Sequence, residues 1–205
     1  MIELYHTPPT RSVRVAWVLK ELGIEYHTRE FLWPVRERDP AYLDLNPAGT
    51  CPTIVDGDLV LTESLAICEY VARTYGSGRL VLNPEDADYY SYLRWLWYGE
   101  ASLSQQLANV MHYGENAPEG QQFPVVVDNA FASYATHLGV VEKGLRDDGF
   151  AVGDQLSLAD VSLAYGLLVG TLFGLGEQFG PRTSRYWQLI SSRPAFKQAC
   201  APLPV

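Results

Sequence analysis

Two neighbouring stretches decide how this sequence is interpreted. Residues 46–54 read Asn-Pro-Ala-Gly-Thr-Cys-Pro-Thr-Ile, and residues 62–67 read Thr-Glu-Ser-Leu-Ala-Ile. Between them, Asp56-Gly57-Asp58 separates two short apolar runs, which predicts a β-hairpin. After the second stretch, apolar residues recur at helical spacing as far as Tyr75, so we expect the hairpin to lead directly into a helix.

The segment that precedes the first stretch predicts a strand, a helix and a second strand. Residues 2–5 are strand-like, and Thr7-Pro8-Pro9-Thr10 ends that strand. The apolar residues of 11–22 fall on one face of a helix, with Arg14 off that face, and Gly23 ends the helix. Residues 24–31 alternate as a strand does. The order βαβ followed by ββα predicts a small α/β domain with a mixed sheet of four strands, over residues 1–76.

The remainder of the chain is predicted to be all-helical. A linker of about ten residues leads to helices over residues 89–112 and 125–145, a third helix from Ser157, and shorter helices over 185–191 and 195–199. Ser157 and Asp160 form a capping-box pattern, and Leu156 and Val161 can form a hydrophobic staple. We therefore expect a second, helical domain over residues 86–205, in which Asp160 is a structural cap rather than an acid catalyst.

Composition excludes several classes of protein. The 205 residues are 47% hydrophobic and carry a net charge of −9, which argues against nucleic acid or an anionic membrane as the main partner. No apolar run approaches the ~20 residues of a membrane span, and the start does not resemble a signal peptide, so we expect a cytoplasmic protein. The three cysteines show no CxxC spacing, so neither a disulfide framework nor a metal site is expected.

The two quoted stretches, together with Ser157-Leu158-Ala159-Asp160, resemble the cytosolic glutathione transferase family over essentially the whole chain. The resemblance implies a thioredoxin-like first domain, a helical second domain, a homodimer and glutathione as co-substrate. The loop after the first strand is of the serine/threonine type, and the class within the family stays unassigned. The implied reaction is attack of the glutathione thiolate on an apolar electrophile. The alternative is a glutathione-binding or ligand-carrying protein with little or no turnover.

The resemblance assigns the binding of glutathione to residues of the two stretches. A cis bond between Cys51 and Pro52 would leave the backbone of Cys51 free to pair, strand-like, with the cysteinyl unit. A plain edge-strand proline is the alternative. Glu63 and Ser64 begin a helix, whose amino end attracts anions; Ser64 can hold the γ-glutamyl carboxylate and Glu63 the ammonium. Simple capping is compatible with these roles.

The glycyl carboxylate needs a partner from the irregular segment that precedes Pro52. Arg36 and Arg38 are candidates because a guanidinium suits a carboxylate, although a solvated arginine is the commoner case. Thr50 can add a polar contact, and Trp33 can form a wall of the site.

The thiol must be activated from the loop after the first strand. A free thiol has a pKa of about 8.5, and each unit of decrease requires about 1.4 kcal/mol of preferential stabilisation of the thiolate. A hydroxyl hydrogen bond together with the amino end of the helix near Arg11 can supply one to two units. Thr7 is the first choice for that hydroxyl and Thr10 the second, with Tyr5 and Ser12 left open. Arg11 can add positive charge near the sulfur, or it can be an ordinary first-turn residue. The loop contains no cysteine for thiol-reducing chemistry.

The helical domain is expected to line a groove between the domains with apolar side chains. The residues predicted for this electrophile site are Tyr98, Leu103, Leu107 and Met111, with Phe173 as a further candidate. His6, His27 and His137 have no partners at metal-ligand spacing, so the sequence assigns no role to them.

Overall fold

The computed structural model describes residues 1–30, 39–114 and 117–201. These divide into two compact units: Met1–Leu82 together with the C-terminal segment from Ser191, and Asn83–Ile190. The predicted boundary near residues 76–86 lies close to the first division. The C-terminal segment from Ser191, which the sequence grouped with the helical domain, groups with the first unit instead.

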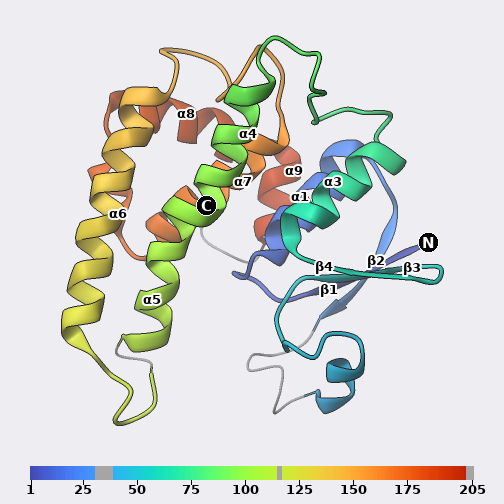
Figure 1. Ribbon diagram of the computed structural model, residues 1–205, viewed down its shortest axis with the longest axis horizontal. Coiled ribbons are helices and arrows are strands. Elements are labelled where there is room, and N and C mark those ends of the chain that lie inside the picture. The colour runs from blue at the N-terminus through green and yellow to red at the C-terminus, as the bar shows by residue number, and fades with distance from the viewer. Residues whose placement is uncertain (31–38, 115–116, 202–205) are drawn as a thin grey trace. The chain divides into compact units, whose positions relative to one another are not determined.

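One mixed sheet of four strands forms the first unit, as predicted. The strands are β1 (Ile2–His6), β2 (Tyr26–Glu30), β3 (Thr53–Asp56) and β4 (Leu59–Thr62), in the order β2-β1-β3-β4. β1 and β2 are parallel, whereas β3 is antiparallel to both β1 and β4. Two helices, α1 (Ser12–Leu22) and α3 (Ser64–Thr74), lie on the same side of the sheet, and the short 3-10 helix η1 (Pro40–Asp44) lies on the other (Figure 1). This is the thioredoxin-like arrangement that the resemblance implied.

α1 is buried on nearly all sides. Residues Ser12–Leu19 are all buried, because α1 packs against β1, α3 and the C-terminal helix α9 (Pro194–Cys200). The rings of Trp17 and Phe196 meet edge to face with centroids 4.9 Å apart, and Arg193 Nε donates to Glu21 Oε2 at 3.2 Å. The prediction that Arg14 lies off the buried face is wrong: Arg14 is 1% exposed, and its Nη1 donates to the hydroxyl of Ser64 at the start of α3.

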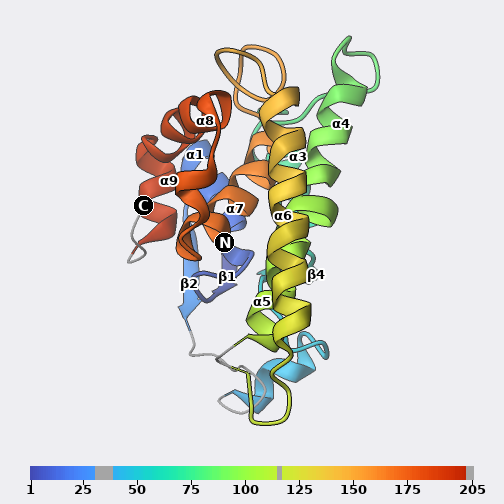
Figure 2. The same cartoon turned by 90° about the vertical axis from the view of Figure 1, so that its left-hand side faces the viewer.

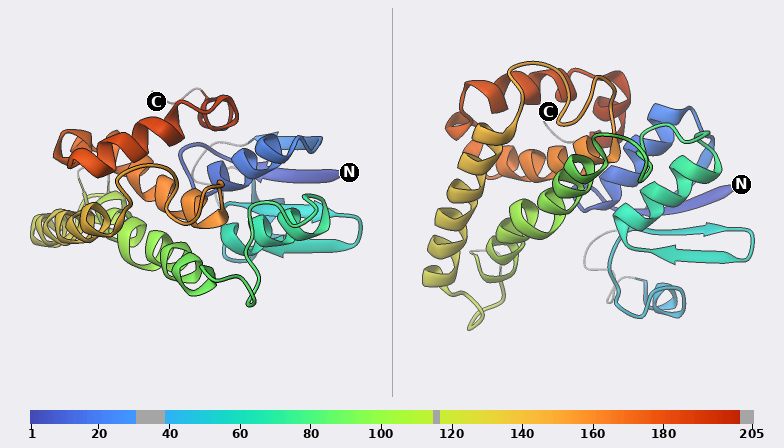
Figure 3. Two further views of the ribbon diagram at one scale, coloured as in Figure 1. Left: turned by 90° about the horizontal axis from the view of Figure 1, so that it is seen from above. Right: turned by 45° about the horizontal axis from the view of Figure 1, so that its top comes forward.

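All regular secondary structure among the described residues of the second unit is helical. Its helices are α4 (Tyr89–Trp97), α5 (Gln105–Tyr113), α6 (Pro124–Gly144), α7 (Leu158–Leu172), the 3-10 helix η3 (Leu175–Gln178) and α8 (Pro181–Ser191). α6 is the long helix in Figure 2, and it runs beside α5. α7 is buried from Leu158 to Gly170. It lies between α8 and the rod that α4 and α5 form together (Figure 3). No helix in the described part of the chain is both long and apolar enough to cross a membrane.

The helix predicted over residues 89–112 contains a π-helical turn, η2 (Tyr98–Ser104). Here the rod crosses α7 closely: a Cβ on Gly99 would lie 2.5 Å from the carbonyl carbon of Ser162. The Ser162 hydroxyl also donates to the carbonyl oxygen of Leu96 at 2.6 Å. The spacing of apolar residues does not reveal such a turn, because the turn depends on α7, which packs against it.

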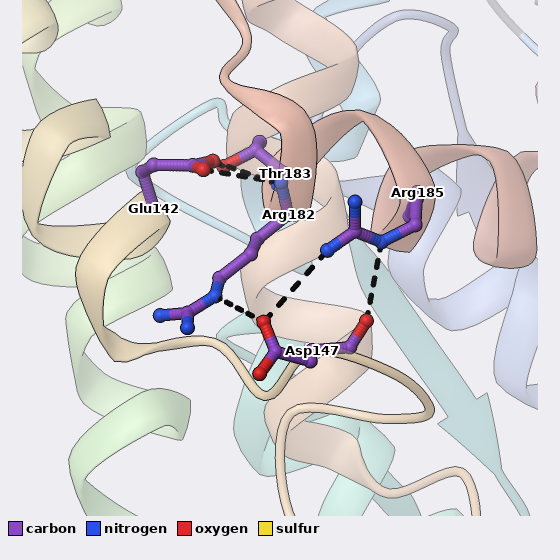
Figure 4. A network of polar contacts seen from close by, with 5 residues as sticks. All are labelled: Glu142, Asp147, Arg182, Thr183 and Arg185. Atoms are coloured by element: carbon purple, nitrogen blue, oxygen red, sulfur yellow. Dashed lines mark hydrogen bonds and ion pairs between the residues drawn. The ribbon is translucent and has the colours of Figure 1, made fainter.

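Two carboxylates hold the amino ends of α7 and α8. Asp160 completes the predicted capping box with Ser157, and it also accepts from Ala151 N at 2.8 Å and from the Tyr186 hydroxyl at 3.0 Å. Glu142, near the end of α6, accepts from Thr183 N at 2.9 Å and from the Thr183 hydroxyl at 2.8 Å (Figure 4). The structural role predicted for Asp160 is confirmed.

Candidate functional site: one end of the sheet

Three segments of the first unit meet at one end of the sheet. Tyr5 pairs with Thr53 across β1 and β3, and Thr53 pairs with Thr62 across β3 and β4. Because both pairs are antiparallel, the residues that follow β1, those that precede β3 and those that follow β4 come to the same edge. These segments carry Thr7, the Cys51–Pro52 pair and the Glu63–Ser64 pair. The strand register thus brings together residues that lie up to 57 positions apart in the sequence.

The loop after β1 is a compact group of hydroxyls. Thr7 is buried, Thr10 and Arg11 are partly buried, and Ser12 is completely buried. The Ser12 hydroxyl lies 2.8 Å from the Thr10 hydroxyl and 2.7 Å from His6 Nδ1. His6 had no role in the sequence analysis, because its partner six residues away is visible only when the chain turns back on itself.

Two side chains from the preceding segment hold the loop that carries Cys51 and Pro52 by hydrogen bonds. The Cys51–Pro52 bond is cis, which confirms the prediction, and Pro8–Pro9 is cis as well. The buried Tyr42 hydroxyl donates to the Thr50 carbonyl at 2.6 Å, and Asn46 Nδ2 donates to the same oxygen at 2.8 Å. These contacts leave the Thr50 side chain exposed, whereas Cys51 and Pro52 are buried. No local pattern assigned these roles to Tyr42 or Asn46, because both roles depend on the tertiary fold.

The thiols of Cys51 and Cys68 are unreactive in character. Burial raises the pKa of Cys51 to about 11, against hydrogen bonding from Tyr42 and Thr7, which acts to lower it. Burial also raises the pKa of Cys68 to about 12. The contact between Thr7 and Cys51 shows that the first loop reaches the second. Since a thiolate is the reactive form, neither cysteine is a candidate nucleophile at neutral pH.

The amino end of α3 combines an exposed carboxylate with a buried cation. Glu63 is exposed and has φ 68°, a left-handed conformation unusual for a residue other than glycine. Ser64 is buried, and its hydroxyl accepts a hydrogen bond from Arg14 Nη1 at 3.1 Å. Arg14 therefore adds positive charge beneath a helix end that already favours anions. The spacing of apolar residues did not reveal this contribution, because it placed Arg14 off the apolar face of its helix.

The four residues predicted to contact an electrophile have different surroundings in the second unit. Leu103 and Leu107 are completely buried, and Leu103 packs against Gly166 of α7. Tyr98 is half-buried, and its hydroxyl lies 2.8 Å from His137 Nδ1. Met111 is 55% exposed. Tyr98 and Met111 thus have surface to offer a ligand, whereas the two leucines are part of the core. Trp33, Arg36 and Arg38 lie outside the described residues.

Comparison with known proteins places this geometry in a family. Residues 10–74 match the model described as glutathione S-transferase, N-terminal domain, and residues 110–194 match that of the C-terminal domain. Glutathione S-transferase 3 of Zea mays is 32% identical, over 100% of this chain and 95% of its own length. The chain belongs to the glutathione S-transferase family. Glutathione S-transferase F9 of Arabidopsis thaliana is likewise 32% identical, over 92% of this chain and 91% of its own length.

Solved glutathione transferases share the fold. A structure titled glutathione S-transferase III in apo form has a TM-score of 0.79 and 30% identity, and covers 100% of this chain and 98% of its own. A glutathione transferase homolog from Lodderomyces elongisporus, solved with two GSH per subunit, has a TM-score of 0.86 and 25% identity, with 99% of each chain covered. Both predictions, the family and the fold class, are confirmed.

Proposed function

We propose that this protein is a glutathione transferase that binds glutathione at the described end of the sheet and transfers its thiolate to an apolar electrophile. The observation that carries the proposal is the convergence of three family motifs at one edge of the first unit: Thr7, Cys51–Pro52 and Glu63–Ser64. Relatives named glutathione S-transferase and a homologous structure with GSH bound support glutathione as the co-substrate.

The two anchors at the amino end of α3 suit the γ-glutamyl unit. Glu63 is exposed, so its carboxylate is available to the ligand ammonium. Ser64 and the free N–H groups of the first turn face the α-carboxylate, and Arg14 strengthens that end through the Ser64 hydroxyl. In this proposal, Arg14 is a positioning residue that the sequence analysis did not include.

The middle and far end of glutathione are assigned to the loop before β3. The backbone of Cys51 pairs with the cysteinyl unit in the manner of an added strand. Thr50, whose side chain is exposed, contacts the glycyl end, and Trp33 and Arg38 complete that part of the proposal from outside the described residues. The thiolate lies against the loop of Thr7, Thr10 and Arg11, where a donated hydrogen bond stabilises it without any proton transfer to the protein.

The two predicted domains have different roles in this proposal. Residues 1–76 bind glutathione, and the helical domain from residue 86 onward binds the electrophile through side chains with accessible surface, among them the half-buried Tyr98 and the exposed Met111. Leu103 and Leu107 shape that surface from within the core. A cytoplasmic homodimer, as expected from the family, completes the proposal.

The test is a pH titration of the ultraviolet absorbance of the thiolate, with glutathione bound to saturating protein. We expect a midpoint at least one unit below that of free glutathione, which corresponds to about a tenfold larger thiolate fraction at lower pH. An unchanged midpoint despite saturation would instead identify a binding protein without turnover.

The binding assignment has its own test, by calorimetry of glutathione with Glu63→Ala. Loss of a charge-assisted hydrogen bond of about 1.5–3 kcal/mol should weaken affinity by roughly ten- to a hundredfold. Glu25→Ala is the matched control, because Glu25 is also exposed and in the same unit. Equal affinities of the two variants would contradict the assignment of Glu63.

A further inference from the structure

The buried Ser12 hydroxyl is the centre of a hydrogen-bond chain that the binding proposal does not use. His6 Nδ1 lies 2.7 Å from Ser12 Oγ, and Thr10 Oγ1 lies 2.8 Å from it. The Thr7 amide donates to the same oxygen at 3.2 Å, and the Thr7 carbonyl oxygen is 3.4 Å away. His6, Thr7 and Ser12 are all at most 8% exposed, whereas Thr10 is only partly buried. The chain therefore runs from a buried imidazole to a hydroxyl at the surface of the candidate site.

Counting protons leaves two arrangements for this chain. A serine hydroxyl has one hydrogen to donate and two lone pairs to accept. The Thr7 amide occupies one lone pair of Ser12 Oγ, so a single lone pair and a single hydrogen are left for His6 and Thr10. The Ser12 hydrogen can also reach the Thr7 carbonyl oxygen at 3.4 Å, but its contacts with His6 and Thr10, at 2.7 and 2.8 Å, are shorter and therefore stronger. Ser12 then donates to one of these two residues and accepts from the other.

The state of His6 Nδ1 decides between the two arrangements. If Nδ1 carries a proton, it donates to Ser12, and Ser12 donates to Thr10. Thr10 Oγ1 then accepts from both the hydroxyl and the amide of Ser12, the latter at 3.3 Å, so its own hydrogen is directed outward. If Nδ1 lacks a proton, Ser12 donates to His6, Thr10 donates inward to Ser12, and a lone pair of Thr10 faces outward.

Only the first arrangement stabilises a thiolate. An outward O–H donates to the negatively charged sulfur, whereas an outward lone pair suits the S–H of a neutral thiol. A change of tautomer leaves the imidazole neutral, so the proton released by the thiol goes to solvent.

We propose that His6 is a positioning residue which, protonated at Nδ1, acts through Ser12 to direct the Thr10 hydroxyl at the sulfur of glutathione. The inference rests on the proposed function, and it makes Thr10 rather than Thr7 the donor to the thiolate. Thr7 instead contacts the Cys51 thiol and supplies the amide that limits the lone pairs of Ser12.

The first test compares His6→Leu with His6→Asn by thiolate titration. Leucine removes the donor, and the asparagine amide returns an N–H near the position of Nδ1. We expect His6→Leu to raise the pKa of the bound thiol by about one unit and to lower kcat at neutral pH by about tenfold, with the affinity for glutathione within about twofold. We expect His6→Asn to keep most of the wild-type value, and His27→Leu, on the exposed face of β2, to keep all of it.

A double-mutant cycle tests whether the three residues act as a unit. Thr10→Val should raise the pKa of the thiol as much as His6→Leu or Ser12→Ala, and the double variant His6→Leu/Thr10→Val should raise it no further. Additive shifts in the double variant, or an effect of Thr7→Val that exceeds that of Thr10→Val, would overturn the inference.

A measurement on the wild-type protein tests the inference even if the variants fail to fold. Imidazole ¹⁵N chemical shifts report which ring nitrogen carries a proton, and the His6→Asn spectrum identifies His6 among the four histidines. We expect a protonated Nδ1 in the complex with glutathione; an unprotonated Nδ1 there would refute the chain. If the wild-type protein does not lower the thiol pKa at all, the proposed function fails as well. If it does and the variants match it, only this inference fails.

Discussion

The carboxylate of Asp160 is the most heavily bonded buried acid among the described residues of the second unit, so its removal should have a large effect. Oδ1 accepts from Ala151 N at 2.8 Å and from the Tyr186 hydroxyl at 3.0 Å. Oδ2 accepts from Ser157 N at 2.9 Å and from the Ser157 hydroxyl at 3.0 Å. Asp160 is completely buried, which raises its pKa, while the four hydrogen bonds act to lower it.

The cost of Asp160→Ala follows from the donors that it leaves behind. The two hydroxyls can rotate toward other acceptors, but the N–H groups of Ala151 and Ser157 cannot. Each unsatisfied buried N–H costs about 1–3 kcal/mol, so we expect the free energy of unfolding to fall by about 4 kcal/mol. Asp160→Asn keeps one acceptor oxygen and directs an NH₂ at the remaining donors, so we expect about half of that loss.

Thermal unfolding followed by tryptophan fluorescence measures this effect. At about 2–4 °C per kcal/mol, Asp160→Ala should unfold roughly 8–16 °C below the wild type. Asp154→Ala is the matched control: the Asp154 side chain is 89% exposed and forms only a surface ion pair with Arg146, so a shift within about 2 °C is expected. If Asp160→Ala unfolds at the same temperature as Asp154→Ala, the argument from buried donors is refuted.

Two further predictions concern the same unit. Burial acts to raise the pKa of Glu142, but hydrogen bonds from Thr183 and Arg182 outweigh it and lower that pKa. Glu142→Gln should therefore cost about 1 kcal/mol at neutral pH, and urea titrations should show this difference shrink as the pH falls below the ordinary pKa of 4.5; a difference independent of pH would contradict it. Gly99→Ala should cost about 1–3 kcal/mol in the same assay because its Cβ would meet the Ser162 backbone, whereas Gly139→Ala, with open space around it, should be neutral or stabilising.

Local patterns were sufficient for much of the candidate site. Pro52 directly after Cys51, and Glu63–Ser64 at the start of a helix, are contiguous motifs, so the sequence identified them without any knowledge of the fold. Their roles toward glutathione stay predictions. Thr7 and Thr10 could not be separated in the same way, because they lie in one turn and share similar chemistry. The choice between them depends on Ser12 and His6, which meet only through folded geometry.

The sequence by itself determined the elements, their order and the family, because apolar periodicity, turn residues and capping motifs act over a few neighbouring positions. Tertiary structure decided what those elements meet. It buried Arg14 under the end of α3, where Arg14 donates to the Ser64 hydroxyl, although periodicity placed Arg14 off the apolar face of its helix. It also placed a π-helical turn where Gly99 crosses α7, and it joined His6 to Ser12. Each of these contacts depends on side chains from another segment, and for that reason no local pattern contained it.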